Sequence, residues 1–158
     1  LLKSVSFPSD KKNIQVFSRL NFGFANLIVA IPDAWIDVQT IADLEEISFE
    51  FRDKNLGKLR AATKYPNLTN DFFLSKGLTQ YKIVNSLGST EIYPYTSQSE
   101  IITDITSTGK TLKANKLRVL KDGNILKSSA CILISKKSLK NKPKKEIILR
   151  LLKKIKKF

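Results

Sequence analysis

Short apolar segments alternate with stretches of helical spacing along most of the chain, which is typical of an α/β protein. Strands are expected at 13–20, 26–31, 58–63, 81–85, 100–104 and 130–135. Helices are expected from Thr40 to Gly57, from about Asn67 to Lys76, and from Pro143 onward. The first of these helices has a capping-box-like start formed by Thr40 and Asp43. The pattern therefore predicts helices packed around a mainly parallel sheet.

The C-terminal third adds three local expectations. Asp122-Gly123-Asn124 separates the apolar segments 117–120 and 125–127 and is a turn sequence of hairpin type. Cys131 lies in an apolar run and is expected to be a buried thiol. The last helix carries an apolar stripe that includes Ile147 and Leu151, with lysines opposite. We expect this helix to pack on its own sheet; lying on an anionic membrane is the alternative.

Composition narrows the classes of function. The 158 residues suffice for one domain or two small lobes, and no run of about 18 apolar residues predicts a membrane span. The chain has no histidine and one cysteine, which excludes histidine-based catalysis, histidine metal sites and an internal disulfide. The net charge of +14 is mostly lysine. No aromatic platform is interleaved with these lysines, so we expect no nucleic-acid partner.

A strand-to-helix turn rich in hydroxyl groups is the most distinctive segment. Its residues are Ser107, Thr108, Gly109, Lys110 and Thr111. Unpaired N–H groups at a helix start favour negative charge, the hydroxyls add donors, and Gly109 permits a close approach. We therefore predict a phosphate-binding loop. A nucleotide P-loop is excluded, because its first glycine would fall at Asp104, and an ordinary turn is the remaining alternative.

Charged and aromatic residues near this loop complete the candidate site. Glu100 and Asp104 are four residues apart on one strand and project to the same face, which suits ribose hydroxyls or a bound Mg²⁺. Lys64 and Tyr65 follow another strand and are expected on the same rim, as a phosphate partner and a base or ribose contact. Glu91 is expected to contact the nucleotide or to anchor the loop. A solvated lysine and a buried tyrosine are the plain alternatives.

Three segments stand in the order and spacing of one known family. They are Ala62–Thr69 (ATKYPNLT), Leu87–Glu91 (LGSTE) and Asp104–Leu112 (DITSTGKTL). From about Val16 to Ser135 the chain resembles the short-form catalytic subunit of ATP phosphoribosyltransferase, most closely its alphaproteobacterial members. Two positions depart from the family pattern: Ser97 replaces a usual glycine, and Lys116 replaces the Asn-Gly that usually ends the helix after the loop.

The resemblance implies an α/β fold with the two-lobed architecture of type II periplasmic binding proteins. Residues 1–32 would be a remnant of the first lobe, 33–116 a complete second lobe with the phosphoribosyl pyrophosphate loop, and 117–158 the return to the first lobe with a C-terminal helix. The family's opening strands have no counterpart here, so we expect the chain to be truncated at its N-terminus.

The resemblance also implies a function. The chain would condense ATP with phosphoribosyl pyrophosphate, giving phosphoribosyl-ATP and pyrophosphate, in the first step of histidine biosynthesis. Mg²⁺ would be the cofactor, a subunit related to histidyl-tRNA synthetase the partner, and the cytoplasm the location. Asp104 and Glu100 would serve catalysis, and the other candidate residues would bind substrate. A two-lobed solute-binding protein without catalysis is the main alternative.

Overall fold

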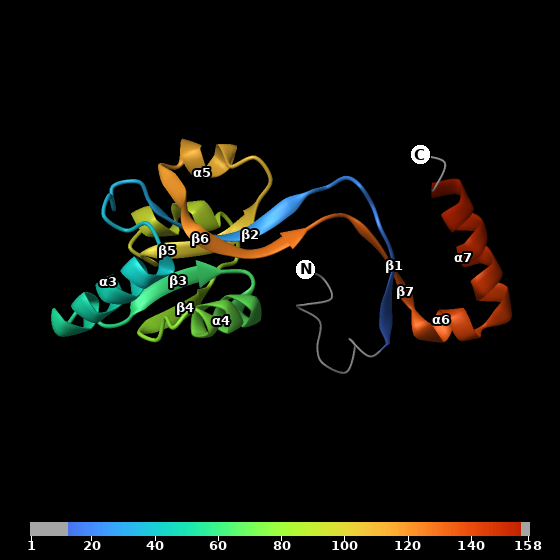
Figure 1. Cartoon of the computed structure of the whole chain (residues 1–158), viewed down its shortest axis with the longest axis horizontal. Coiled ribbons are helices and arrows are strands. Elements are labelled where there is room, and N and C mark those ends of the chain that lie inside the picture. Colours follow the sequence, from blue (N-terminus) through green and yellow to red (C-terminus); the bar gives the residue numbers. More distant parts are fainter. Residues whose placement is uncertain (1–12, 156–158) are drawn as a thin grey trace. The chain divides into compact units, whose positions relative to one another are not determined.

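The computed structural model describes residues 13–155 and divides them into two compact units (Figure 1). One unit comprises residues 24–128, and the other combines residues 13–23 with 129–155. The lobe boundaries predicted from the sequence lie after residues 32 and 116. The two units divide the chain after residues 23 and 128 instead, and the lobe boundaries stay predictions.

The larger unit is built on a five-stranded sheet. In spatial order its strands are β4 (Tyr81–Asn85), β3 (Leu59–Thr63), β5 (Ile101–Thr106), β2 (Ala25–Pro32) and β6 (Leu117–Ser128). β3 pairs in parallel with β4 and β5, whereas β2 is antiparallel to both of its neighbours. Four strands therefore share one direction, with β2 running between two of them in the opposite direction.

Apolar side chains cover both faces of this sheet, because successive strand residues project to opposite sides. Val29 and Ile31 belong to a core shared with α3 (Ile41–Asp53) and α4 (Pro66–Ser75). Ile28 and Ala30 belong to a second core, shared with α5 (Lys110–Ala114) and the 3₁₀ helix η1 (Thr90–Tyr95). The larger unit thus has three layers, and the predicted α/β class is confirmed.

The start of α3 is the predicted capping box. The Thr40 hydroxyl accepts from the Asp43 amide at 3.3 Å, and the Asp43 carboxylate accepts from the Thr40 amide at 2.8 Å. A third residue joins from a distant strand, since the Asp122 carboxylate accepts from the Ile41 amide at 2.9 Å. The Ile41 and Asp43 amides in the first turn of α3 therefore have acceptors outside the helix ladder, as helix starts require.

The predicted hairpin at Asp122-Gly123-Asn124 is wrong, because β6 is one strand of 12 residues that runs through it. Between the pairs Leu27–Leu126 and Ala30–Val119, β2 advances three residues while β6 advances seven. The extra residues form a bulge, and the turn residues serve that bulge instead of a chain reversal. A β-carbon on Gly123 would lie 3.1 Å from the Val29 carbonyl oxygen, so glycine allows the two strands to approach here.

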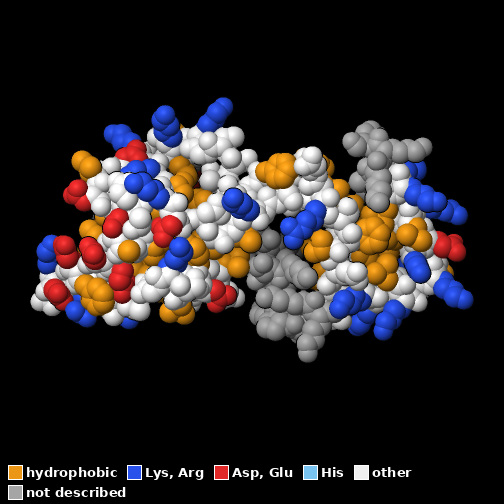
Figure 2. Space-filling view, in the orientation of Figure 1, with side chains coloured by type: hydrophobic (Ala, Val, Ile, Leu, Met, Phe, Trp, Pro, Cys, Tyr) orange, Lys and Arg blue, Asp and Glu red, His pale blue; other side chains and the backbone are white. Residues whose placement is uncertain are grey.

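The smaller unit pairs β1 (Ile14–Arg19) with β7 (Cys131–Ser135) in antiparallel fashion and continues into α6 (Lys136–Lys140) and α7 (Lys142–Ile155). The Cys131 side chain is exposed, so the expectation of a buried thiol is wrong. On α7, Leu152 is buried, whereas Ile147 and Leu151 are more than half exposed. Figure 2 shows hydrophobic side chains at the surface of this unit among lysines and arginines.

Both positions that depart from the family's glycines have a left-handed backbone. Ser97 has a φ of 56° and Lys116 a φ of 50°, a region in which a β-carbon is unfavourable. The surrounding structure holds Lys116 in place, because its carbonyl oxygen accepts from the Asp33 amide at 2.9 Å and from the Tyr95 hydroxyl at 2.8 Å. The side chains at both positions therefore oppose the local fold.

We expect Ser97→Gly and Lys116→Gly each to raise the free energy of unfolding. The gain should be roughly 0.5–1 kcal/mol, the cost of a left-handed β-carbon less the added entropy of glycine in the unfolded chain. Urea unfolding measures it. Thr96→Gly is the control, because Thr96 has a φ of −108° and glycine brings no relief there. Equal or lower stability of both variants would contradict the account.

Candidate functional site

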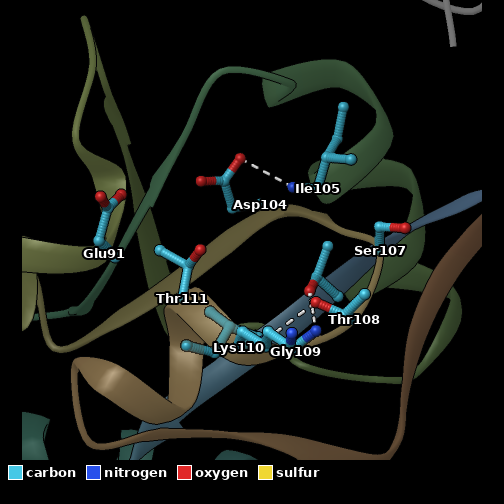
Figure 3. A pocket seen from close by; sticks show the side chains of 10 residues that line it. Glu91, Asp104, Ile105, Ser107, Thr108, Gly109, Lys110 and Thr111 are labelled. Carbon is cyan, nitrogen blue, oxygen red and sulfur yellow. Dashed lines mark hydrogen bonds between the residues drawn. The ribbon is translucent and has the colours of Figure 1, made fainter.

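A cavity of about 210 Å³ opens where β5 ends and the predicted phosphate loop begins (Figure 3). It is lined by Glu91, Asp104, Ile105, Thr106, Ser107, Thr108, Gly109, Lys110, Thr111 and Leu112. Seven of the ten predicted site residues, Asp104, the loop and Glu91, therefore share one cavity. Its walls come from η1, the end of β5 and the first turn of α5.

Hydroxyl groups hold the loop in its conformation. Gly109 has a φ of 72° and donates its amide to the Thr106 hydroxyl at 2.9 Å. The Ser107 hydroxyl donates to the Phe24 carbonyl at 2.9 Å and so ties the loop to the residue before β2. Sequence reasoning missed Thr106, although a threonine three residues before a glycine is a recognisable turn pattern. Ser107 therefore anchors the loop to Phe24, and it also lines the cavity.

The Asp104 carboxylate lies partly buried above this loop. It accepts from the Ile105 amide at 2.7 Å. Burial raises the pKa of Asp104 above its ordinary value, and the nearby charge of Glu91 raises the pKa further. The Ile105 amide, the Lys64 ammonium and the Thr90 hydroxyl oppose that rise. The free protein therefore holds a carboxylate whose charge is incompletely compensated.

Lys64 and Tyr65 reach the same rim through strand register. Thr63 pairs with Thr103 where β3 and β5 run in parallel, so the next residues, Lys64 and Asp104, follow side by side. The charge of Asp104, after burial, contributes to the raised pKa of Tyr65. The structure therefore brings Lys64 and Tyr65 close to Asp104, as the sequence predicted.

Glu100 lies at the other end of β5 from the loop. Its carboxylate accepts from the Arg60 amide at 2.6 Å and forms an ion pair with the Arg60 guanidinium, which raises the pKa of Arg60. Glu100 and Asp104 do share a strand face, but four residues at about 3.3 Å each separate them by roughly 13 Å. We therefore leave Glu100 out of the proposed site. The alternation of side chains along a strand predicts which face a residue occupies, but it does not predict that two residues lie at the same end of the strand.

Within residues 13–155, no group of three or more histidine, cysteine, aspartate or glutamate residues is placed to hold a metal ion. In the same range, no helix is long and apolar enough to cross a membrane.

A family model described as ATP phosphoribosyltransferase matches residues 4–157. The chain belongs to this family. The ATP phosphoribosyltransferase of Chelativorans sp. (strain BNC1) is 48% identical over 133 residues, which are 84% of this chain and 58% of that protein. That of Mesorhizobium japonicum is 49% identical over 125 residues, 78% of this chain and 54% of that protein. The chain thus spans a little over half the length of these relatives, and the predicted resemblance is confirmed.

Solved structures agree with the predicted architecture. The ATP phosphoribosyl transferase (HisG:HisZ) complex from Thermotoga maritima contains a chain with 26% identity and a TM-score of 0.69, covering 91% of this chain and 61% of that one. A probable amino-acid ABC transporter extracellular-binding protein from Bacillus subtilis, at 10% identity and a TM-score of 0.55, covers 96% of this chain and 62% of that one. The second likeness shows the fold alone, and together they confirm a fold like that of type II periplasmic binding proteins.

The pKa shifts of two aspartates predict stability changes of opposite sign. Asp104→Asn should stabilise the free protein at pH 7, because it removes a carboxylate whose pKa is raised by burial. This gain should shrink as the pH falls from the raised pKa to below 3.8, where the aspartate is protonated in the folded and unfolded states alike. Urea unfolding between pH 3 and pH 7 measures the change.

Asp43→Asn is the control with the opposite expectation. Amides of Gln39 and Thr40 donate to this carboxylate and lower the pKa of Asp43. Its charge therefore stabilises the folded state above 3.8, and the stabilisation is lost as the pH falls through the lowered pKa. Asp43→Asn should destabilise the protein at pH 7. Loss of stability in both variants at pH 7 would contradict the assigned environment of Asp104.

Proposed function

We propose that this chain carries the phosphoribosyl pyrophosphate site of an ATP phosphoribosyltransferase, acting in the first step of histidine biosynthesis. In that reaction the N1 atom of adenine forms a bond to C1 of the ribose, and the bond from C1 to pyrophosphate breaks. The observation that supports this most is the cavity in which Asp104 and the loop from Ser107 to Thr111 lie together. The same segment, DITSTGKTL, carries the family resemblance.

The loop is suited to the 5′-phosphate of the substrate. Gly109 and Lys110 direct their amides to the Thr106 and Thr108 hydroxyls, so the turn is held before ligand arrives. Lys110 adds positive charge at the cavity, and the Thr111 side chain lines it from the first turn of α5. Lys64 adds positive charge beside Asp104. Because the turn is already formed, ordering the loop on binding costs less conformational entropy.

Asp104 is suited to the ribose. Its carboxylate accepts hydrogen bonds, as ribose hydroxyls require, and its negative charge favours the cationic sugar that develops as pyrophosphate departs. Burial raises the pKa of Asp104 because it destabilises the charged carboxylate. A positive charge that arrives beside this carboxylate therefore stabilises it. Glu91 faces the same cavity and adds to the negative field. No strong base is needed, which agrees with a chain without histidine.

Mg²⁺ fits this donor set as a substrate-borne ion. Magnesium in proteins commonly binds one or two carboxylates together with substrate phosphates, and Asp104 and Glu91 provide two carboxylates on one cavity. When bound, the ion would neutralise the departing pyrophosphate. The protein's own task is then to hold the ribose and the phosphate in line.

The proposal includes a partner and a location. The structure from Thermotoga maritima is described as a HisG:HisZ complex, which supports a regulatory subunit of the histidyl-tRNA synthetase type for this chain as well. We place the reaction in the cytoplasm. The alternative of a solute-binding protein without catalysis has weaker support, since the binding-protein likenesses concern the fold alone.

Replacing Gly109 by alanine tests the phosphate loop. A β-carbon at a φ of 72° costs about 1–2 kcal/mol of folding stability, and at this glycine it would also occupy the open space that the ligand needs. Because the added methyl group takes this space, we expect the affinity for phosphoribosyl pyrophosphate, measured by calorimetry, to fall at least tenfold, a change of about 1.4 kcal/mol.

Gly77→Ala is the matched control. Gly77 has a φ of 84°, and a β-carbon added there would meet no atom within 4 Å, as at Gly109. It follows α4, however, and does not line the cavity. Both variants should lose similar stability, and Gly77→Ala should keep the wild-type affinity. Equal affinity in the two variants would overturn the assignment of the loop.

A further inference from the structure

Three buried threonines form a closed ring of hydroxyl groups beneath the rim of the cavity. Thr63 ends β3, Thr103 lies in β5 and Thr69 lies in α4, and all three residues are fully buried. The oxygen–oxygen distances are 2.6 Å from Thr103 to Thr63, 2.7 Å from Thr69 to Thr103 and 3.3 Å from Thr63 to Thr69. The ring joins β3 and β5, the strands that lead to the rim, to the helix that packs beside them.

The direction of the ring follows from the number of donors. Thr103 donates to Thr63, and each hydroxyl has one proton and two acceptor positions. Thr63 must therefore donate to Thr69, and Thr69 to Thr103. The second acceptor position of Thr63 takes the amide of Tyr65 at 2.9 Å. Every buried hydroxyl of the ring is then satisfied, and the ring also holds the turn after β3.

The position of the ring relates it to the cavity. Thr63 and Thr103 are a directly opposed pair in the parallel ladder, and both face α4. The residues that follow them, Lys64 and Asp104, then project to the opposite face, which carries the cavity. A slip of one residue between β3 and β5 would turn one of these side chains away. Apolar residues could fill the same space but would not oppose such a slip by directed bonds.

We propose that Thr63, Thr69 and Thr103 are positioning residues that fix the register of β3 against β5, and so hold Lys64 and the Tyr65 turn beside Asp104. None of the three lines the cavity. The consequence for ligand binding rests on the function proposed above, whereas the consequence for the turn after β3 does not.

Thr69→Val tests the ring without altering a residue of the cavity. Valine has the shape of threonine but accepts no proton from Thr63, so the ring is opened and a buried donor loses its partner. Thr69→Ser restores the hydroxyl and should restore the wild-type behaviour. Ser99→Ala is the control, because it also removes a buried hydroxyl, which donates to Ile101 at the opposite end of β5. If Thr69→Val does not fold, Thr69→Ala is used in its place.

Amide hydrogen exchange of Tyr65 is the first readout. In Thr69→Val this amide should exchange about tenfold faster relative to the slowest amides of the sheet, because the turn opens locally while the core persists. Thr69→Ser and Ser99→Ala should leave that ratio at its wild-type value. A Tyr65 amide that accelerates no more than the slowest core amides, or equally in Ser99→Ala, would show a purely structural role and overturn the proposal.

Affinity for phosphoribosyl pyrophosphate, measured on fully folded samples, is the second readout. We expect about a tenfold loss in Thr69→Val and a change within twofold in Thr69→Ser and Ser99→Ala. Wild-type affinity in Thr69→Val, despite a loosened turn, would remove the link to the ligand. If the wild-type protein itself does not bind phosphoribosyl pyrophosphate, the proposed function fails, and the exchange ratio alone decides on the ring.

Discussion

The larger unit depends on the parallel pairing of β3 with β5. Thr63 lies opposite Thr103 in this ladder, so both strands reach the same rim together. The side chains that follow, Lys64 and Asp104, are therefore neighbours although 40 residues separate them in the sequence. The loop after β5 begins at Ser107, three residues after Asp104, and the cavity forms above it. Slippage by one residue would separate these groups, so the register of one ladder governs the whole site.

The same rim carries a feature that opposes folding. The Asp104 carboxylate is partly buried with a raised pKa, and it lines the cavity. Gly109 has a left-handed backbone, which glycine adopts without the penalty of a β-carbon. Ser97 and Lys116 also have positive φ, but neither lines the cavity. We therefore regard the strain at Ser97 and Lys116 as a local defect that glycine relieves.

Much of this arrangement could be predicted from local sequence, and the failures share a physical cause. Alternation and capping identified the strands and the start of α3, because these signals act over a few residues. The turn sequence around Gly123 was misread, since whether such residues reverse a strand or bulge it depends on β2, nearly a hundred residues earlier. Glu100 was placed on the correct face but at the wrong end of β5. The threonine ring joins three elements and gives no local signal at all.

Amide chemical-shift mapping with phosphoribosyl pyrophosphate tests the central claim most directly. Titrating the isotopically labelled protein should shift the amides of residues 107–112 together with those of Lys64 and Asp104, with one common saturation curve. Amides beside Glu100 and Arg60, at the opposite end of β5, should keep their positions. Saturable shifts centred on Glu100, or no saturable shifts in the loop, would contradict the account.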